Sequence, residues 1–307
     1  MKLIHAPSEI QTLGRKVSVA IGVFDGVHLG HQQVIRQALA DAHQHEGIAI
    51  VITFDCHPNA VVAPAHVPPL IYSLPQKLRV IASLGVETTW LIHFDRPFSE
   101  QSAETFIRNL AGNFAPVHSI CVGNAFTFGH RRQGNVALLR ELGRELHLIV
   151  HGLAAVSLDG EIVSSTRIRE AIRAGDLDLA SQMLGREYSL TAKVVRGDGL
   201  GRQLGFPTAN LDVTGLVLPP HGVYAAHVRI DGAVHRAVLN IGIRPTVAQQ
   251  NPQVRFEVHL LDFEADLYDQ EIEVIYVEKL RDEKKFSSPA ALREQIERDI
   301  AAARQLF

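Results

Sequence analysis

The sequence contains, where an apolar run at residues 17–23 ends, the stretch Gly22-Val23-Phe24-Asp25-Gly26-Val27-His28-Leu29-Gly30-His31. The apolar run predicts a buried strand and the amphipathic residues 31–44 predict a helix, so a glycine-containing turn joins the two. A helix start exposes backbone N–H groups and the positive end of the helix dipole, which together favour a phosphate. His28 and His31 are expected to face the same space, where an imidazole N–H can donate to a phosphate oxygen. The chain has 16 histidines, so a chance pair is the alternative, but its position directly after a buried strand favours a phosphate site.

The first half of the chain continues this alternation of strands and helices. Further strands are predicted at residues 48–54, 89–94, 119–122 and 146–151, and further helices at 74–84, 103–110 and 135–142. Strands of nearly continuous apolar character are typical of a parallel sheet that is buried on both faces. The pattern predicts a doubly wound α/β domain with its ligands beyond the carboxyl ends of the strands. A helical stretch at 166–184 is expected to end this domain, which gives domains 1–185 and 186–307.

The second half of the chain has a different pattern of predicted strands and helices. Strands are predicted at residues 190–195, 222–230, 235–241, 254–261 and 272–277, joined by turns that contain Gly, Pro and Asp, and a helix is predicted at 290–306. Closely spaced strands with one closing helix indicate a small antiparallel β-barrel.

A second motif lies in this half and runs Gly197-Asp198-Gly199-Leu200-Gly201-Arg202-Gln203-Leu204-Gly205-Phe206-Pro207-Thr208-Ala209-Asn210. Its glycines alone are weak evidence, because tight turns between strands also use Gly. Pro207 stiffens the loop, and Thr208 and Asn210 offer the oxygen ligands that magnesium prefers. The motif therefore predicts a second phosphate site.

Composition restricts the class of protein. The chain has 307 residues, enough for two domains, with 46% hydrophobic and 21% charged residues, a soluble globular composition. A net charge of −3 gives no argument for a nucleic acid or membrane partner, and neither a secretory signal nor a membrane span is expected. Two cysteines fit a reducing compartment, so a cytoplasmic enzyme is predicted; no oligomeric partner is indicated. Cys56 beside His57 leaves a nucleophilic thiol as an alternative, although no third partner is evident.

The first motif resembles the opening motif of the bacterial bifunctional riboflavin kinase/FMN adenylyltransferase (FAD synthetase) family, and its histidine pair resembles that of the HxGH nucleotidyltransferases. The resemblance implies that the FMN phosphate attacks the α-phosphorus of ATP and that pyrophosphate leaves, without a covalent enzyme intermediate. His28 and His31 would be catalytic, stabilising the pentacoordinate transition state. The nucleotide-binding residues that it implies in the first half are Gly22, Phe24, Asp25, Gly30, Asn124, Ser164, Ser165, Thr166 and Arg169.

Two segments refine this resemblance. The run Ser164-Ser165-Thr166-Arg167-Ile168-Arg169 is by itself a helix N-cap, but it is similar to the family's Ser-Ser-Thr-x-x-Arg motif, which would grip the β- and γ-phosphates. Ala125 departs from the family, which usually has Asp or Asn there. Asn124 could replace the missing polar group, although adjacent side chains on a strand point oppositely. A riboflavin kinase with a weakened adenylyltransferase domain is therefore the alternative.

The second motif resembles the diagnostic motif of riboflavin kinases. Thr208 and Asn210 would hold Mg-ATP, with zinc used in some relatives, and the loop that contains Gly199, Gly201 and Pro207 would cover the nucleotide. Glu257 matches the family's catalytic base for the ribityl 5′-hydroxyl. Residues 281–286 resemble a segment that closes on the flavin, with Arg281, Glu283 and Phe286 in contact with it, and a charged surface turn is the alternative. Residues 240–246 are also similar to the family, without an evident role.

The expected function is thus ATP-dependent phosphorylation of riboflavin to FMN, followed by adenylylation of FMN to FAD. Riboflavin, FMN and ATP are the expected partners and Mg²⁺ the expected cofactor. A flavin- or nucleotide-binding regulator on an inactive scaffold is a further alternative. It is disfavoured because the chain keeps the residues expected to do the chemistry: His28, His31, Thr208, Asn210 and Glu257.

Overall fold

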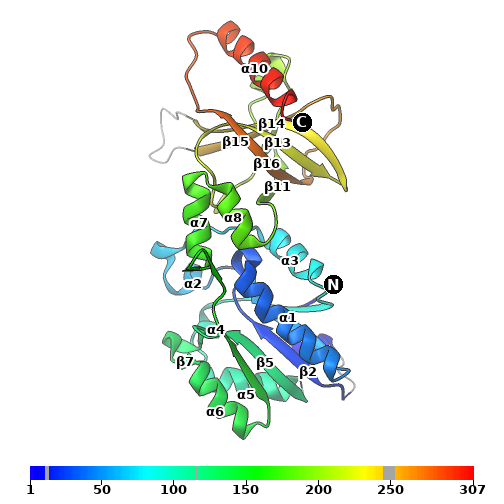
Figure 1. The fold of residues 1–307 in the computed structure, drawn as a ribbon, viewed down its shortest axis with the longest axis vertical. Coiled ribbons are helices and arrows are strands. Elements are labelled where there is room, and N and C mark those ends of the chain that lie inside the picture. Colours follow the sequence, from blue (N-terminus) through cyan, green and yellow to red (C-terminus); the bar gives the residue numbers. More distant parts are fainter. Residues whose placement is uncertain (11–13, 115, 245–252) are drawn as a thin grey trace. The chain divides into compact units, whose positions relative to one another are not determined.

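The computed structural model describes residues 1–10, 14–114, 116–244 and 253–307. The chain divides into two compact units (Figure 1). The first unit contains Met1–Ile168 and Met183–Gly185, and the second contains Arg169–Gln182 and Arg186–Phe307. Within the described ranges, no helix is both long and apolar enough to span a bilayer. Residues 245–246 of the family-like segment 240–246 lie outside the described residues.

The first unit is built on a six-stranded parallel sheet, which confirms the predicted α/β class. The strand order is β1 (Lys2–Ile4), β4 (Thr88–Ile92), β3 (Ile48–Phe54), β2 (Val17–Ile21), β5 (Val117–Gly123) and β8 (Ile149–Leu153). Strand β1 was not predicted, because a three-residue strand has too little pattern to detect. The strand predicted at 146–151 starts later, at Ile149, because α6 (Val136–Glu145) continues into a turn.

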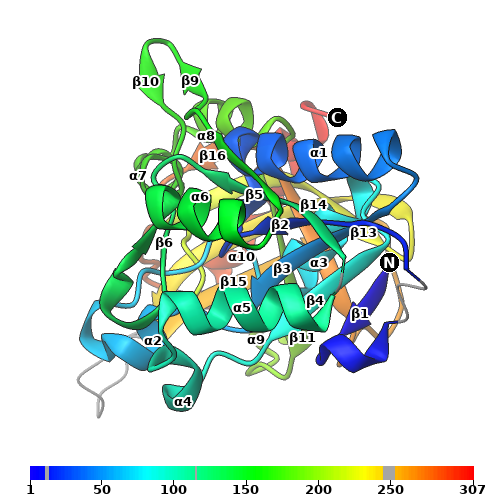
Figure 2. The ribbon, with the colours of Figure 1, turned by 90° about the horizontal axis from the view of Figure 1, so that it is seen from below.

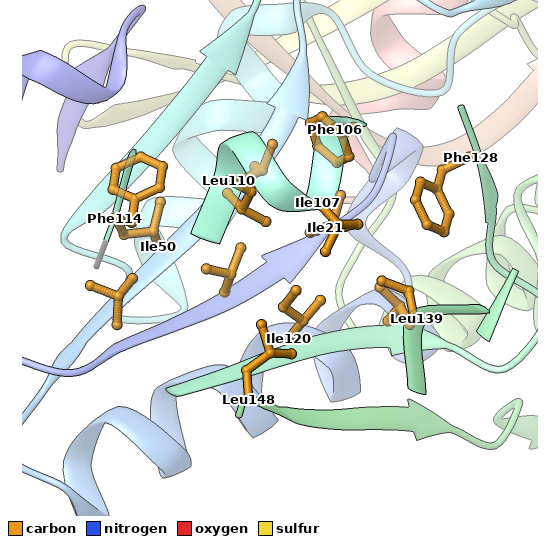
Figure 3. Packing of buried hydrophobic residues seen from close by; sticks show 14 of the residues in the cluster. Ile21, Ile50, Phe106, Ile107, Leu110, Phe114, Ile120, Phe128, Leu139 and Leu148 are labelled. Atoms are coloured by element: carbon orange, nitrogen blue, oxygen red, sulfur yellow. The ribbon is translucent and has the colours of Figure 1, made fainter. Parts of the chain in front are cut away.

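Helices cover both faces of this sheet, as Figure 2 shows for α1 (Leu29–Gln44) and α5 (Ala103–Asn113). Alternate residues of β2 explain this arrangement. Val17, Val19 and Ile21 pack with α5 and α6 (Figure 3), whereas Ala20 packs with α1 and α3 (Leu74–Ser83) on the other face. Such two-sided burial is the reason that the strand is apolar at almost every position.

Short elements fill the connections of the first unit. They are η1 (Pro7–Glu9), η2 (Asp25–Val27), α2 (Asn59–Val62), η3 (Pro64–His66), α4 (Arg96–Ser99), η4 (His130–Arg132), and the hairpins β6 (Thr127–Phe128) with β7 (Gly134–Asn135) and β9 (Ser157–Leu158) with β10 (Glu161–Ile162). The connections leave β2 on one side for β3 and β4, and the chain then returns to β5 on the other side of β2. This reversal makes the carboxyl end of β2 the topological switch point, where ligands bind in such sheets.

The helical stretch predicted at 166–184 is two helices, α7 (Ser165–Ala174) and α8 (Leu177–Leu184). Gly175 has a φ of +83°, which ends α7 in the left-handed conformation that glycine tolerates. The Asp176 carboxylate then accepts a hydrogen bond of 3.0 Å from the Leu179 N–H and caps the second helix.

The second unit contains the predicted antiparallel barrel, and it is closed. Its strand order is β11 (Ser189–Val195), β12 (Ala209–Leu211), β15 (Gln253–Leu260), β14 (Ala233–Arg244), β13 (Gly222–Ile230) and β16 (Glu271–Arg281), with β16 pairing back to β11. Alternate residues such as Tyr224, Ala226 and Val228 of β13 fill the barrel core. The intervening Val223 and Ala225 pack outside it with Ala303 of α10 (Pro289–Arg304).

Candidate active sites

The loop after β2 has a strained backbone. Phe24, Gly26 and Val27 have φ values of +52°, +76° and +42°, and for a β-branched residue such as Val27 this conformation is rare. The buried Asp25 supports it, since one of its carboxylate oxygens lies 2.9 Å from the Ile71 N–H, which donates to it. Strain that the surrounding structure holds in place is common at functional sites. The Asp25 carboxylate thus fixes the shape of the loop, and its predicted role in nucleotide binding remains a prediction.

The loop ends on the two histidines, which the structure brings together as predicted. His28 is the N-cap of α1, which begins at Leu29, two residues before the predicted start, and its Nδ1 accepts a hydrogen bond of 3.4 Å from the His31 N–H. The two imidazole rings stack with centroids 3.6 Å apart. A Cβ atom at Gly30 would lie 3.2 Å from His28 Cε1, so glycine leaves room for that ring. Because Nδ1 accepts this hydrogen bond, a neutral His28 ring carries its proton on Nε2.

The predicted serine segment begins α7. Ser164 Oγ accepts from the Arg167 N–H at 3.2 Å, as the N-cap interpretation requires, and Ser165 Oγ donates to the Asp25 carbonyl at 3.1 Å. The second contact joins the start of α7 to the loop that carries the histidines. Thr166 is exposed, and Arg169 is the first residue of the second unit.

A cavity of about 740 Å³ opens beyond the carboxyl ends of β2 and β3, within the first unit. Phenylalanines dominate its wall, and they are Phe54, Phe94, Phe98, Phe106, Phe126 and Phe128. Its cationic lining consists of Arg96, Arg131 and Arg132, with His57 and His130, and none of the described residues that line it is Asp or Glu. A cavity of this size with apolar walls and few polar groups suits a planar aromatic ligand. The cavity was not predicted, because its phenylalanines come from several elements that are far apart in the sequence, among them β3, α4, α5 and β6.

The departure at position 125 lies outside this cavity. Asn124 and Ala125 are exposed and occupy a turn after β5, so the alternation of side chains along a strand does not apply to them. The Asn124 N–H donates to the Leu153 carbonyl at 2.8 Å, which holds the turn against β8. Neither side chain lines the cavity.

The alternative of a nucleophilic cysteine finds no support in the geometry. Burial raises the pKa of the Cys56 thiol, and the Asp55 carboxylate raises it further. The Cys56 thiol lies 3.7 Å from the Phe94 carbonyl, whereas His57 Nδ1 accepts from the Asn59 N–H at 3.1 Å. A reactive thiol has a lowered pKa, so Cys56 has the opposite environment.

The Pro-Thr-Ala-Asn motif lies partly on a strand, β12, rather than in a loop as predicted. Asn210 of β12 lies opposite Glu257 of β15 in the antiparallel register. A Cβ atom at Gly197 would lie 2.2 Å from Asn210 Nδ2, so the glycine-rich loop packs directly on that amide. The loop also forms a short helix, α9 (Leu200–Gln203), and the Phe206 N–H donates to the Gly201 carbonyl at 2.8 Å. The structure thereby gathers most of the residues predicted for this site.

Glu257 belongs to the outward side of β15. Phe256, Val258 and Leu260 fill the barrel core, so the alternate residues Arg255, Glu257 and His259 share the opposite face. Arg255 forms an ion pair with Asp198 of the glycine-rich loop, and its guanidinium lies 3.9 Å from the Glu257 carboxylate. His259 Nδ1 lies 2.8 Å from the Pro207 carbonyl oxygen. The contacts of Arg255 and His259 were not predicted, although the alternation of β15 was sufficient to place both residues on the same face as Glu257.

The predicted flavin segment, residues 281–286, is held to α10 by an ion pair. The Arg281 guanidinium donates to both carboxylate oxygens of Asp299, with the shortest distance 2.7 Å, and lies 5.8 Å from the ring centroid of Phe286. Glu283 accepts from the Ile243 N–H at 3.3 Å. Arg281 thus shapes the segment through α10, and contact of these side chains with a flavin remains a prediction.

Comparison with known proteins matches both halves of the chain. The riboflavin kinase family model matches residues 184–307, and the FAD synthetase family model matches residues 10–167. The bifunctional riboflavin kinase/FMN adenylyltransferases of Haemophilus influenzae and Escherichia coli are each 36% identical to the chain; the alignments cover all of this chain and 99% and 98% of those proteins.

A solved structure agrees over the whole length. A crystal structure from Streptococcus pneumoniae titled as a macrolide-efflux protein has a TM-score of 0.81 and 30% identity, covering 99% of this chain and 98% of that one. Two family models in the predicted order, and full-length relatives with 36% identity, confirm the resemblance that the motifs indicated. The chain therefore belongs to the bifunctional riboflavin kinase/FMN adenylyltransferase family.

Proposed function

We propose that the chain makes FAD from riboflavin in two ATP-dependent steps, one in each half. The barrel phosphorylates riboflavin to FMN and releases ADP. The α/β domain then transfers the adenylyl group of a second ATP to FMN and releases pyrophosphate. One observation carries the proposal: each half of the chain matches one of the two family models and holds its own cluster of candidate site residues. His28 and His31 stack in the first half, and Asn210 pairs with Glu257 in the second.

For adenylyl transfer, we assign the triphosphate to the start of α1 and the isoalloxazine ring to the phenylalanine-lined cavity. An oxygen of the FMN phosphate attacks the α-phosphorus of ATP, and the bond to the pyrophosphate oxygen breaks. His28 and His31 donate hydrogen bonds as negative charge builds on the phosphates. The residues Gly22, Phe24, Gly30, Ser164, Ser165, Thr166 and Arg169 are assigned to the nucleotide.

For phosphorylation, Glu257 is the base that accepts the proton of the ribityl 5′-hydroxyl while its oxygen attacks the γ-phosphorus of ATP. Thr208 and Asn210 present two neutral oxygens beside that carboxylate, a set that suits Mg²⁺ because this ion keeps waters and phosphate oxygens as its other ligands. When bound, Mg²⁺ neutralises charge on the phosphates. The glycine-rich loop packs against Asn210 and is positioned to cover the nucleotide.

A kinase with a weakened adenylyltransferase domain is not favoured. The FAD synthetase model matches residues 10–167, and the atypical Ala125 is exposed and does not itself line the cavity. The catalytic division is proposed at residues 185/186. We place the enzyme in the cytoplasm, where free thiols such as Cys56 and Cys121 persist.

Chromatography of the flavins formed from riboflavin and Mg-ATP tests the proposal. The wild-type chain is expected to form FMN and then FAD. Glu257→Gln should lose FMN formation but still convert supplied FMN to FAD, and His31→Ala should do the reverse. Riboflavin that stays unchanged with wild-type protein, or a folded single variant that loses both activities, would contradict two separate sites.

A further inference from the structure

A lysine is buried between the two strands that lead to the proposed ATP and flavin positions of the first unit. Lys77 of α3 is 7% exposed. Its ammonium group donates to the Phe54 carbonyl at 2.8 Å, the Thr53 hydroxyl at 3.2 Å and the Val23 carbonyl at 3.3 Å. These three acceptors match the three donors of an ammonium group.

The acceptors belong to two different strand ends. Val23 follows β2 and precedes the histidine loop, whereas Thr53 and Phe54 end β3. Both Val23 and Phe54 line the phenylalanine cavity. The fully buried Thr53 hydroxyl donates in turn to the Val23 carbonyl at 3.0 Å, so hydroxyl and ammonium group together connect the two ends.

An ammonium group is a costly choice for a simple structural connection, because burial penalises its charge. Burial lowers the pKa of Lys77 to about 8. The titratable groups that act on it are Asp25 of the histidine loop, with Asp55 and Cys56 after β3, and each opposes that fall. Lys77 is therefore charged at neutral pH and loses its charge within a pH range in which the enzyme can be assayed.

We propose that Lys77 is a positioning residue for adenylyl transfer, because its ammonium group fixes the strand end that bears the histidine loop against the strand end that borders the flavin cavity. The spacing of these two ends sets the distance between the α-phosphorus of ATP and the phosphate of FMN. The inference rests on the proposed placement of ATP and flavin in this unit, which wild-type FAD formation and the His31→Ala variant test separately.

The main test is Lys77→Met, which keeps an unbranched side chain as far as the ε carbon and removes the ammonium group, with exposed Lys16→Met in the same unit as its control. A misplacement of about 1 Å costs roughly 100-fold in rate. We expect kcat for FAD formation from FMN to fall by about that factor, with KM for ATP and FMN changed much less. Riboflavin phosphorylation, the control reaction in the same molecule, should be unchanged, and Lys16→Met should match wild type in both reactions.

The pH profile separates positioning from a purely structural role. Wild-type kcat for FAD formation should decline as pH rises through about 8, and Lys77→Met should lack this decline. If Lys77→Met does not fold, kcat of Thr53→Val is compared with that of Thr53→Ser instead. Only Thr53→Ser keeps the hydroxyl that connects the two strand ends, so its kcat should be the higher. Wild-type kcat in folded Lys77→Met, an unchanged decline above pH 8 in that variant, or equal kcat in the two Thr53 variants overturns the proposal.

Discussion

The ion pair between Arg281 and Asp299 allows a quantitative prediction about the barrel. The Asp299 side chain is 6% exposed and that of Arg281 is 20% exposed, and the pair is bidentate. Gln295 Nε2 donates to Asp299 at 2.7 Å, and Lys284 donates to Gln295 at 2.6 Å. Asp299→Ala would leave a mostly buried guanidinium without its carboxylate and would break the chain of contacts that holds the predicted flavin segment.

Breaking a buried ion pair from one side costs about 3–5 kcal/mol. Because Arg281 retains some access to water, we expect about 3 kcal/mol, the lower end of that range. The pair between Arg304 and Asp262 is the matched control: it is also bidentate and its shortest distance is also 2.7 Å, but its side chains are 45% and 71% exposed. Asp262→Asn should change stability little, because Asn tolerates the φ of +56° at this position as Asp does and water replaces the lost charge.

Urea unfolding measures this difference. Far-UV circular dichroism follows both units, while fluorescence of the chain's one tryptophan, Trp90 of β4, follows the first unit. We expect Asp299→Ala to lower the midpoint of the barrel transition and to leave the Trp90 transition unchanged. Riboflavin phosphorylation should weaken in the same variant. Equal effects of Asp299→Ala and Asp262→Asn on the barrel transition would refute the reasoning.

Three further predictions concern single positions. Gly197→Ala places a Cβ atom 2.2 Å from Asn210 Nδ2, so riboflavin phosphorylation should fall at least tenfold while FAD formation from FMN remains, and equal loss of both would contradict this. Ala125→Asn should leave kcat for FAD formation within about threefold, since surface changes are nearly neutral; a larger gain would revive the weakened-domain alternative. Burial lowers the pKa of His118 below 6.5, so the unfolded state takes up a proton first and the first unit should lose stability as pH falls through 6.5. His118→Gln should flatten that dependence in Trp90 fluorescence, and an identical slope would refute the assignment.

The sequence predicted local geometry better than contacts between distant residues. The closeness of His28 and His31 was predictable because they are three residues apart at a helix start. The position of Ser164 as an N-cap was predictable for the same reason. The pairing of Asn210 with Glu257 could not be predicted in this way. The two residues are more than forty positions apart, and the register of their strands depends on the closed barrel.

The cavity and the lysine show what lay beyond the sequence pattern. Phe54, Phe98 and Phe128 are apolar residues like any others in the sequence, and they form one wall only when β3, α4 and β6 meet at the edge of the sheet. Lys77 lies on an amphipathic helix, where a lysine ordinarily faces water. Its burial follows from the approach of α3 to the ends of β2 and β3, which no periodicity encodes.

The amino-acid sequence by itself determined the two fold classes and their order along the chain, and it supplied the residues predicted to bind phosphate. Hydrophobic periodicity and turn chemistry are properties of neighbouring residues, so they can be recognised without coordinates. Only the tertiary structure decided which side chains became partners, such as Arg255 with Asp198 and Lys77 with Thr53. Hydrogen bonds and ion pairs depend on distances of a few ångströms, and those distances are set by how whole elements pack.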